Sequence, residues 1–287
     1  MLTRGTAHLV MRTPRPAIAF VDHAHPAVQT ATSENSLLLG WYQEQRCVLI
    51  ESAHSPAEDP AFVVAGDSGY EELRPLTLLL SEPEAALLAY ARALSYWRAR
   101  HRRCGSCGAR NQSLRAGHVL RCTNPSCAQE SFPRLDPAII VLVTDGERAL
   151  LGRQASWPPN RYSTIAGFVE PGESLEDAVT REVFEETGVR VASSSYHSSQ
   201  PWPFPSSLML GFQALATPGE IVCNDAELED ARWFTRAEIA SGNPKLPPPT
   251  SISYRLIEQW FDQGSKAPLA SLGSVGRWDA HSAQATR

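Results

Sequence analysis

The chain has 287 residues, of which 43% are hydrophobic, and this length predicts two domains with a small insert. Its formal net charge of -5 at pH 7 argues against broad nonspecific attraction to nucleic acid or to an anionic membrane. Because the N-terminus lacks the apolar segment of a targeting signal and no apolar run approaches the roughly 20 residues of a membrane span, we expect a soluble, cytoplasmic protein with no membrane partner.

Short apolar runs indicate a β-rich N-terminal domain over residues 1–97, which includes part of a connecting helix. Residues 1–16 show little periodicity, and we expect them to be loosely ordered. The candidate strands that follow are AIAFVD, SLLLGWYQ, RCVLIE, AFVVAG and LRPLTLLL, with a hairpin between the second and the third. Cys47 lies in a strand pattern, which favours a buried structural thiol. The domain carries no nucleophile constellation, so we expect a catalytically silent scaffold or a dimerisation element.

A long helix is predicted from Ser81 to about Arg103, with a serine cap and Pro83 in its first turn. The region from Ala85 to Gln129 has no acidic residue but contains Arg92, Arg98, Arg100, Arg102, Arg103, Arg110, Arg115 and Arg121. Such a positive patch can contact a phosphate or an RNA backbone, or it can be a solvated face that pairs with acidic neighbours. Arginine enrichment alone does not choose between the two.

Four thiols with zinc-ribbon spacing lie in residues 98–132: Cys104, Cys107, Cys122 and Cys127. The turns CGSCG and CTNPSC let one Zn²⁺ ion take two sulfurs from each. Disulfides are the alternative, and the expected cytosolic location argues against them. Because all four ligands come from the protein, this zinc has no open position for water, and we assign it a structural role.

Residues 133–263 have the strand and helix patterns of a second, α/β domain. The run from Pro137 to Asp145 is apolar without alternation, which is typical of a strand buried on both faces at the centre of a sheet. Asp145 and Gly146 then form a tight turn into a return strand. A further strand, RYSTIAG, leads into an acidic loop and helix.

This acidic stretch, from Gly167 to Val189, predicts a helix over Leu175 to Thr187. Ser174 is the expected N-cap with Asp177 as its partner, and Gly188 is the expected left-handed C-cap. The apolar stripe of the first turns continues into Glu182 and Glu186, with Glu185 at its flank. Buried carboxylates need a cation, and oxygen ligands suit Mg²⁺ or Mn²⁺ bound to phosphate oxygens.

A solvated glutamate-rich face is the simpler explanation of such a helix. Against it, the stretch fixes nine positions, Gly-x5-Glu-x7-Arg-Glu-Val-x-Glu-Glu-x-Gly-Val, and average residue usage gives this pattern by chance in roughly one chain in ten million. The stretch resembles the Nudix box at every one of these positions. The resemblance implies an α/β/α sandwich with a mixed sheet that hydrolyses a nucleoside diphosphate linked to another moiety.

An aromatic, proline-rich segment follows, SSQPWPFPSS, in which the prolines are expected to keep Trp202 and Phe204 outside a regular element and able to stack on a base or nicotinamide ring. The alternative is a turn whose aromatic rings fill the core. Together with the four cysteines and FPRLDP, this segment resembles the NADH pyrophosphatase branch of the Nudix family. That branch implies a degenerate Nudix-like N-terminal domain.

The resemblance also implies roles for individual residues. Metal ligands for Mg²⁺ or Mn²⁺ would be the Ala166 carbonyl, Glu182, Glu185, Glu186 and Glu227, with Glu220 and Glu229 as competitors for the last position. Glu182, Glu185 and Glu186 form the catalytic set, and Glu186 is the candidate base. Substrate contacts would be Phe132, Phe168, Gln200, Pro201, Trp202, Pro203, Phe204, Pro205, Ser206, Ser207 and Ser253, with the two nicotinamide-bracketing rings, Phe132 and Phe168, coming from different subunits of a homodimer. Some relatives carry Tyr where this chain has Phe132, and some have a shorter second cysteine turn.

The implied reaction is hydrolysis of NADH or NAD to AMP and nicotinamide mononucleotide, with removal of 5′ NAD caps from RNA as a second activity. Two alternatives stay open: a broader hydrolase of ADP-ribose and related dinucleotides, and a zinc-ribbon protein that binds nucleic acid. A last helix is expected from about Ser251 to Gln263, and residues 264–287 are rich in Gly, Ser and Ala, which favours a disordered tail.

Overall fold

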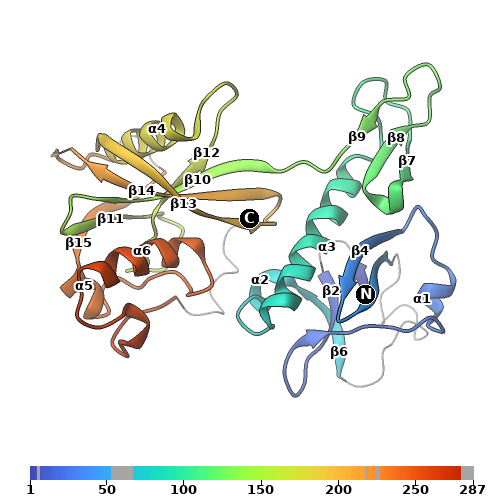
Figure 1. Cartoon of the computed structure of the whole chain (residues 1–287), viewed down its shortest axis with the longest axis horizontal. Coiled ribbons are helices and arrows are strands. Elements are labelled where there is room, and N and C mark those ends of the chain that lie inside the picture. The colour runs from blue at the N-terminus through green and yellow to red at the C-terminus, as the bar shows by residue number, and fades with distance from the viewer. Residues whose placement is uncertain (5–6, 53–66, 218, 224–226, 279–287) are drawn as a thin grey trace. The chain divides into compact units, whose positions relative to one another are not determined.

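The computed structural model describes residues 1–4, 7–52, 67–217, 219–223 and 227–278 (Figure 1). It divides into two compact units, and each is described by itself. The first unit contains Met1–Leu135 and Pro203–Ser206, and the second contains Asp136–Trp202 and Ser207–Arg287. Among the described residues, no helix is long and apolar enough to cross a membrane.

The first unit contains a six-stranded sheet in the order β3-β2-β1-β5-β4, with β6 paired to β2. Its strands are β1 (Leu2–Arg4), β2 (Ala7–Met11), β3 (Ala17–Ile18), β4 (Ser36–Tyr42), β5 (Gln45–Glu51) and β6 (Ser68–Glu72). The expected hairpin is β4 and β5, and the Cys47 thiol is buried, as predicted. Burial also raises the pKa of this thiol.

Two expectations for this unit were wrong, and a third falls on residues that the structure does not describe. Loose order over residues 1–16 was wrong, because β1 and β2 lie in the sheet and place Leu2, Leu9 and Val10 in the core. The run LRPLTLLL contains the short helix α2 (Leu73–Leu76) instead of a strand. The candidate strand AFVVAG lies outside the described residues. A further short helix, α1 (Pro26–Gln29), follows β3.

The long helix is α3 (Glu82–Arg100), which begins after Ser81 as predicted. It leads into a small three-stranded sheet made of β7 (Asn111–Leu114), β8 (Val119–Cys122) and β9 (Glu130–Ser131), with the 3-10 turn η2 (Arg115–Gly117) between the first two. This sheet carries the cysteine turns.

The second unit is built on a mixed sheet in the order β13-β14-β10-β11-β15, with β12 paired to β10. Its strands are β10 (Asp136–Thr144), β11 (Arg148–Arg153), β12 (Ile165–Phe168), β13 (Val191–Trp202), β14 (Ser207–Ala216) and β15 (Asp230–Thr235). β10 is parallel to β14 and antiparallel to β11 and β12. The predicted central position of the Pro137–Asp145 strand is therefore confirmed.

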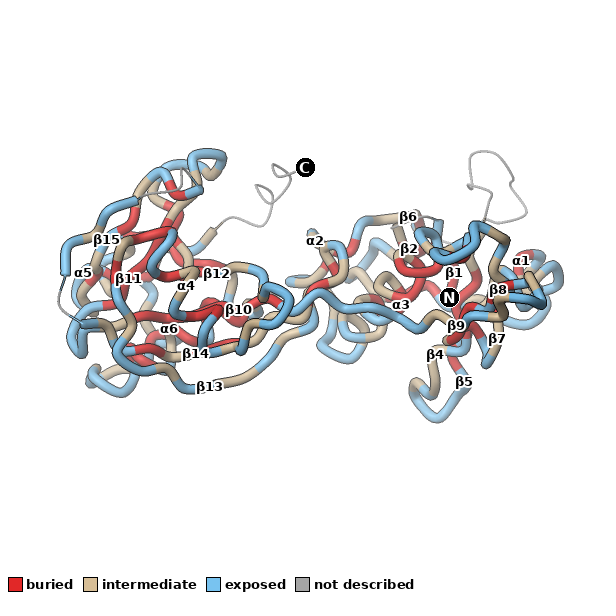
Figure 2. The backbone as a smooth tube through the Cα atoms, turned by 90° about the horizontal axis from the view of Figure 1, so that it is seen from above, coloured by how far each residue is buried: buried red, intermediate tan, exposed pale blue. Residues whose placement is uncertain are grey.

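Helices cover both faces of this sheet (Figure 1). α4 (Leu175–Thr187) lies on one face, and α5 (Arg236–Ala240) and α6 (Ile252–Gln263) lie on the other. Successive side chains of β10 alternate between the two cores: Ile139 and Val141 pack with the α4 residues, and Ile140 and Leu142 pack with the α6 residues. This two-sided burial explains the continuous apolar run in the sequence. Figure 2 colours the buried stretches of the backbone red.

The predicted helix ends are confirmed. The Ser174 hydroxyl accepts a hydrogen bond from the Asp177 backbone N–H, and Gly188 closes α4 with φ of 68°. α6 begins after its Ser251 cap. The expected tail does not begin at residue 264, because the turn η3 (Leu269–Ser271) buries Leu269 in the α6 core.

Candidate active site

α4 packs on the sheet through Ala178, Val179 and Val183, and this packing brings the neighbouring Glu182 to β12. The Glu182 carboxyl group lies against the backbone of Gly167, so closely that a Cβ at residue 167 would overlap it. Gly167 is itself fixed by its pairing with Ile139 of the central strand. The sheet therefore sets the position of the Glu182 carboxylate.

Arg181 joins an acidic cluster formed by Glu173, Glu182 and Glu185. Its guanidinium pairs with Glu173 at 2.8 Å, Glu182 at 2.8 Å and Glu185 at 3.0 Å, and it also donates to the Phe168 carbonyl at 2.9 Å. Arg181 thus orients glutamates and ties the loop before α4 to the helix.

Glu173 is a member of this cluster to which the sequence pattern alone gave no role. Its carboxylate accepts two hydrogen bonds from Arg181, from Nε and from Nη2, and these lower its pKa to about 2. Its place in the spaced pattern, eight residues before Arg181, was the available signal. Glu173 meets Arg181 only because the loop folds back against α4.

Glu185 and Glu186 are adjacent in sequence but differ in environment. The Glu185 side chain is 52% exposed and paired with Arg181, whereas Glu186 is only 4% exposed. A carboxylate as buried as Glu186 must be compensated by hydrogen bonds, a proton or a cation. Glu186 is therefore the inner carboxylate of the pair.

Glu227 comes from the segment that precedes β15. Earlier in the same connection, the Val222 backbone N–H donates to the Thr187 carbonyl at the C-terminal end of α4, at 2.8 Å. Glu227 is exposed, and its negative charge acts on Glu182. The pKa of Glu182 is raised, first by burial and further by the charges of Glu185 and Glu227, against the opposing effect of Arg181.

The donor set of this cluster fits a divalent cation. Arg181 pairs with three carboxylates, which leaves negative charge in excess, and hard cations such as Mg²⁺ prefer carboxylate oxygen ligands. Ala166 precedes Gly167 on β12 and is exposed. In the part of the chain that the structure describes, the glutamates are not gathered as tightly as the zinc-ribbon cysteines.

The expected nicotinamide-contacting rings are both accessible. Phe168, which ends β12, is 59% exposed, and Phe132 of the first unit is 49% exposed. Ser253 is buried at the start of α6, and its hydroxyl accepts a hydrogen bond from the Thr164 hydroxyl at 2.9 Å. A substrate contact by Ser253 stays a prediction.

The proline-rich segment is divided among three places. Gln200, Pro201 and Trp202 are the last residues of β13, Pro203–Ser206 form a tip that belongs to the first unit, and Ser207 begins β14. The expectation that Trp202 lies outside a regular element was wrong, since it pairs with Ser207. β13 is an edge strand, where a proline without an N–H is tolerated.

The four cysteines Cys104, Cys107, Cys122 and Cys127 lie together, with their sulfur atoms all within 4.8 Å of one another. They are free thiols, so the disulfide alternative does not apply. Backbone N–H groups of Ser106 and Cys107 lower the pKa of the Cys104 thiol to about 7, which favours the thiolate that a metal needs. The geometry is that of a structural zinc site.

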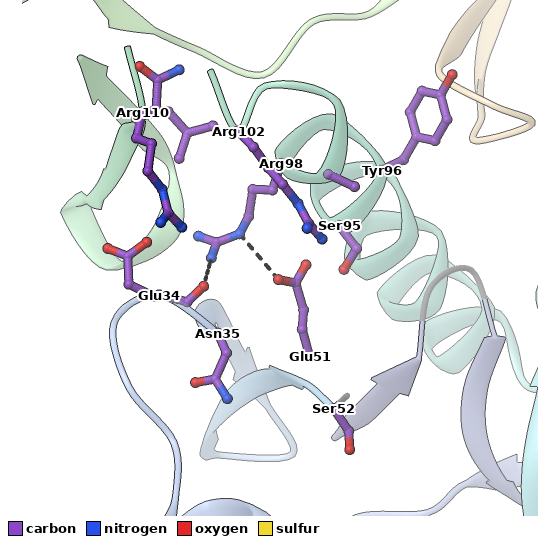
Figure 3. Close-up of a pocket in the computed structure, with 12 residues that line it drawn as sticks. Glu34, Asn35, Glu51, Ser52, Ser95, Tyr96, Arg98, Arg102 and Arg110 are labelled. Atoms are coloured by element: carbon purple, nitrogen blue, oxygen red, sulfur yellow. Dashed lines mark hydrogen bonds and ion pairs between the residues drawn. The ribbon is translucent and has the colours of Figure 1, made fainter. Parts of the chain in front are cut away.

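A separate recess of about 470 Å³ lies in the first unit, between α3, β5 and the small sheet (Figure 3). Buried Arg98 crosses it: its guanidinium donates to the Ser113 hydroxyl and the Glu34 carbonyl and pairs with Glu51 at 3.6 Å. Arg98 is thus a structural cross-link. For this arginine the pairing interpretation of the arginine-rich stretch holds.

The sequence matches three domain families. Residues 1–97 match the "NADH pyrophosphatase-like rudimentary NUDIX domain", residues 99–132 match the "NADH pyrophosphatase zinc ribbon domain", and residues 134–259 match the "NUDIX domain". The three matches follow one another along the chain.

Curated relatives match as well. The chain is 40% identical over 268 residues to the "NAD-capped RNA hydrolase NudC" of Pseudomonas aeruginosa, covering 88% of this chain and 94% of that protein. It is 48% identical over 175 residues to the protein of the same name from Stutzerimonas stutzeri, covering 61% of each. It is 42% identical over 202 residues to the human "NAD-capped RNA hydrolase NUDT12", and this match spans 65% of the chain but only 44% of the human protein.

Proposed function

The chain belongs to the Nudix hydrolase family, in the branch with a rudimentary NUDIX domain and a zinc ribbon, and we propose that it hydrolyses the pyrophosphate of NADH and NAD. The products would be AMP and nicotinamide mononucleotide. The observation that carries the proposal is the set of glutamates on α4, in which Glu182 lies against Gly167 and Glu186 is buried.

Glu182, Glu186 and Glu227, with the Ala166 carbonyl, would hold Mg²⁺ or Mn²⁺, and Glu185 would supply a further carboxylate at the rim. When bound, such an ion neutralises charge on a diphosphate and lowers the pKa of water. Arg181 keeps Glu182 and Glu185 in place through its ion pairs. A preorganised set of this kind avoids the cost of reorienting charged groups during the reaction.

Hydrolysis adds water across the bridging P–O–P group. The water oxygen bonds to one phosphorus, the bond from that phosphorus to the bridging oxygen breaks, and the bridging oxygen leaves on the other phosphate. The proton lost by the water passes to the Glu186 carboxylate, which is the buried member of the pair. Exposed Phe168 is available to stack on the nicotinamide ring.

Removal of NAD caps from RNA is the second proposed activity, because the same pyrophosphate joins nicotinamide mononucleotide to the first nucleotide of the RNA. The curated relatives named as NAD-capped RNA hydrolases support this extension. We also propose a homodimer in which Phe132 of one subunit and Phe168 of the other bracket the nicotinamide. Light scattering of the purified protein tests the dimer.

The direct test is product analysis after incubation with NADH, NAD-capped RNA or ADP-ribose in the presence of Mg²⁺ or Mn²⁺. AMP and reduced nicotinamide mononucleotide from NADH are the expected products, and ¹⁸O from labelled water in one of them identifies the phosphorus that is attacked. Absence of AMP at saturating dication contradicts the proposal. RNA binding at about 0.2 M salt without cleavage would instead favour the zinc-ribbon binding alternative.

A further inference from the structure

The tip of the proline-rich segment packs within the first unit. Pro203 is buried there, and the Phe204 ring is partly buried against a core cluster that includes Leu88 and Leu76. The residues immediately before and after the tip belong to β13 and β14 of the second unit. The segment expected to contact the substrate is thus interrupted by four residues that the rudimentary domain holds.

Two arginines of that domain contact the tip. Arg92 of α3 donates from Nε to the Pro203 carbonyl at 2.8 Å. The guanidinium carbons of Arg74 and Arg92 lie 4.6 Å and 5.2 Å from the centroid of the Phe204 ring. Arg92 is largely buried, with 13% of its side chain exposed, and it also pairs with Glu72 at 3.0 Å.

Placing two cations beside one ring needs compensation, because each raises the energy of the other. Burial and the charge of Arg92 both lower the pKa of Arg74. The negative face of an aromatic ring offsets part of this repulsion, and desolvated cation–π contacts are the stronger ones. Phe204 is therefore engaged by the protein, so it fills this arginine site instead of stacking freely on a ligand.

The other end of the segment is anchored as well. The Gln200 side chain donates to the Thr250 carbonyl at 2.8 Å and accepts from the Ile252 backbone N–H at 2.8 Å, which fixes it to the start of α6. Pro201 and Trp202 lie between these two anchors. Residues that the fold already orders lose less conformational entropy when they bind a ligand.

We propose that Arg92, assisted by Arg74, is a positioning residue through which the rudimentary domain orders the substrate-binding segment around Trp202. The inference rests on the proposed function. It assigns the otherwise silent domain a role in substrate affinity, exerted through the Pro203 carbonyl and the Phe204 ring.

The test compares R92M with three other variants of the full chain. R92M keeps the apolar stem and removes the donor and the charge, whereas R92K retains a charge and one donor. E72Q removes only the acidic partner of Arg92. R100A removes an exposed arginine of the same helix. The measurements are KM and kcat on NADH, and hydrogen exchange of peptides covering residues 200–208 without substrate.

For R92M we expect KM to rise about tenfold with kcat within about twofold of the parent, and faster exchange of the 200–208 peptides but not of α4. R92K should recover most of the affinity, and E72Q and R100A should match the parent. If R92M leaves both KM and the hydrogen exchange of the 200–208 peptides unchanged, the proposal is wrong. A fall in kcat at constant KM also overturns it, because that result indicates a smaller folded fraction of the enzyme. If the parent itself does not hydrolyse NADH, the proposed function fails, while exchange in R92M still decides whether Arg92 orders the segment.

Discussion

The Glu182 carboxyl group occupies the space that a Cβ on residue 167 would need, so Gly167 and Glu182 form a single fitted unit across β12 and α4. Gly167 is required here for close approach and not for an unusual backbone conformation, since its φ is not in the left-handed region. The first and the central residues of the spaced acidic pattern are thereby linked by direct contact.

Replacing Gly167 by Ala should displace the Glu182 carboxylate and lower NADH turnover by about 10²-fold, because small misplacements of reacting groups have effects of this size. The comparison variant is G273A in the same unit, where an added Cβ meets no atom within 4 Å. Both proteins should show the same thermal midpoint within a few degrees. Parental turnover by G167A would mean that the position of Glu182 is not important for the reaction.

Glu186 is expected to accept the proton of the attacking water. Converting Glu186 to Gln preserves shape but removes the basic oxygen, and the turnover number should fall by about 10²- to 10⁴-fold. E176Q, on the exposed first turn of the same helix, is the matched control and should keep parental activity. Near-normal turnover by E186Q at saturating Mg²⁺ removes the assignment to this residue.

Much of the fold could be predicted from local sequence patterns. The caps of α4 were readable because Ser174 and Gly188 act within one turn of the helix, and the buried strand β10 was readable because both of its faces are apolar. The predictions of loose order at residues 1–16 and of a tail from residue 264 were wrong for a related reason. Leu2 and Leu269 lie in apolar stretches too short to show a period, and only the tertiary fold shows that a core accepts them.

The sequence predicted that several glutamates of α4 lie close together, but it did not predict which side chains make contact. Spacing on one helix placed Glu182, Glu185 and Glu186 together, whereas the contacts of Arg181 with Glu173 and of Arg92 with Pro203 join residues that no periodic pattern relates. Arg92 and Pro203 are 111 positions apart. Such pairs depend on the packing of whole elements, which the sequence does not display.

Trp202 is the aromatic residue that ends β13 in the proline-rich segment. W202A should raise KM on NADH about 5- to 100-fold, because base-aromatic stacking contributes about 1–3 kcal/mol by alanine substitution. W41A removes an exposed tryptophan of β4 and should have no effect. A smaller loss on ADP-ribose, which lacks nicotinamide, is expected. Equal losses on both substrates would instead favour the broader dinucleotide hydrolase.

The cysteine cluster should hold about one zinc ion per chain, measured by elemental analysis. C122S removes one of the four ligands and should reduce the zinc content to a small fraction, while C223S, at the exposed cysteine outside the cluster, should retain it. Because a fully liganded zinc has no open position, we expect the folded fraction of C122S to keep kcat within about threefold. A loss of several orders of magnitude in kcat would indicate a catalytic role.

His8 of β2 gives the first unit a pH-dependent stability. It is fully buried, and burial lowers its pKa to about 4, with a further contribution from the charge of Arg92. Between pH 6.5 and 4 the unfolded chain binds a proton that the folded chain does not. The contribution of His8 to the free energy of unfolding is therefore constant above pH 6.5 and falls by up to roughly 3 kcal/mol toward pH 4.

Urea denaturation at pH 7.5 and pH 5, followed through hydrogen exchange of the β2 and β6 peptides, measures this loss. H8L cannot titrate, so its stability should fall less over the same interval. Other groups that titrate in this range, including the cysteines, are common to both proteins and cancel in the difference. Identical pH dependence of the parent and H8L would show that His8 is protonated at its ordinary pKa in the folded chain, with water or a partner compensating its charge.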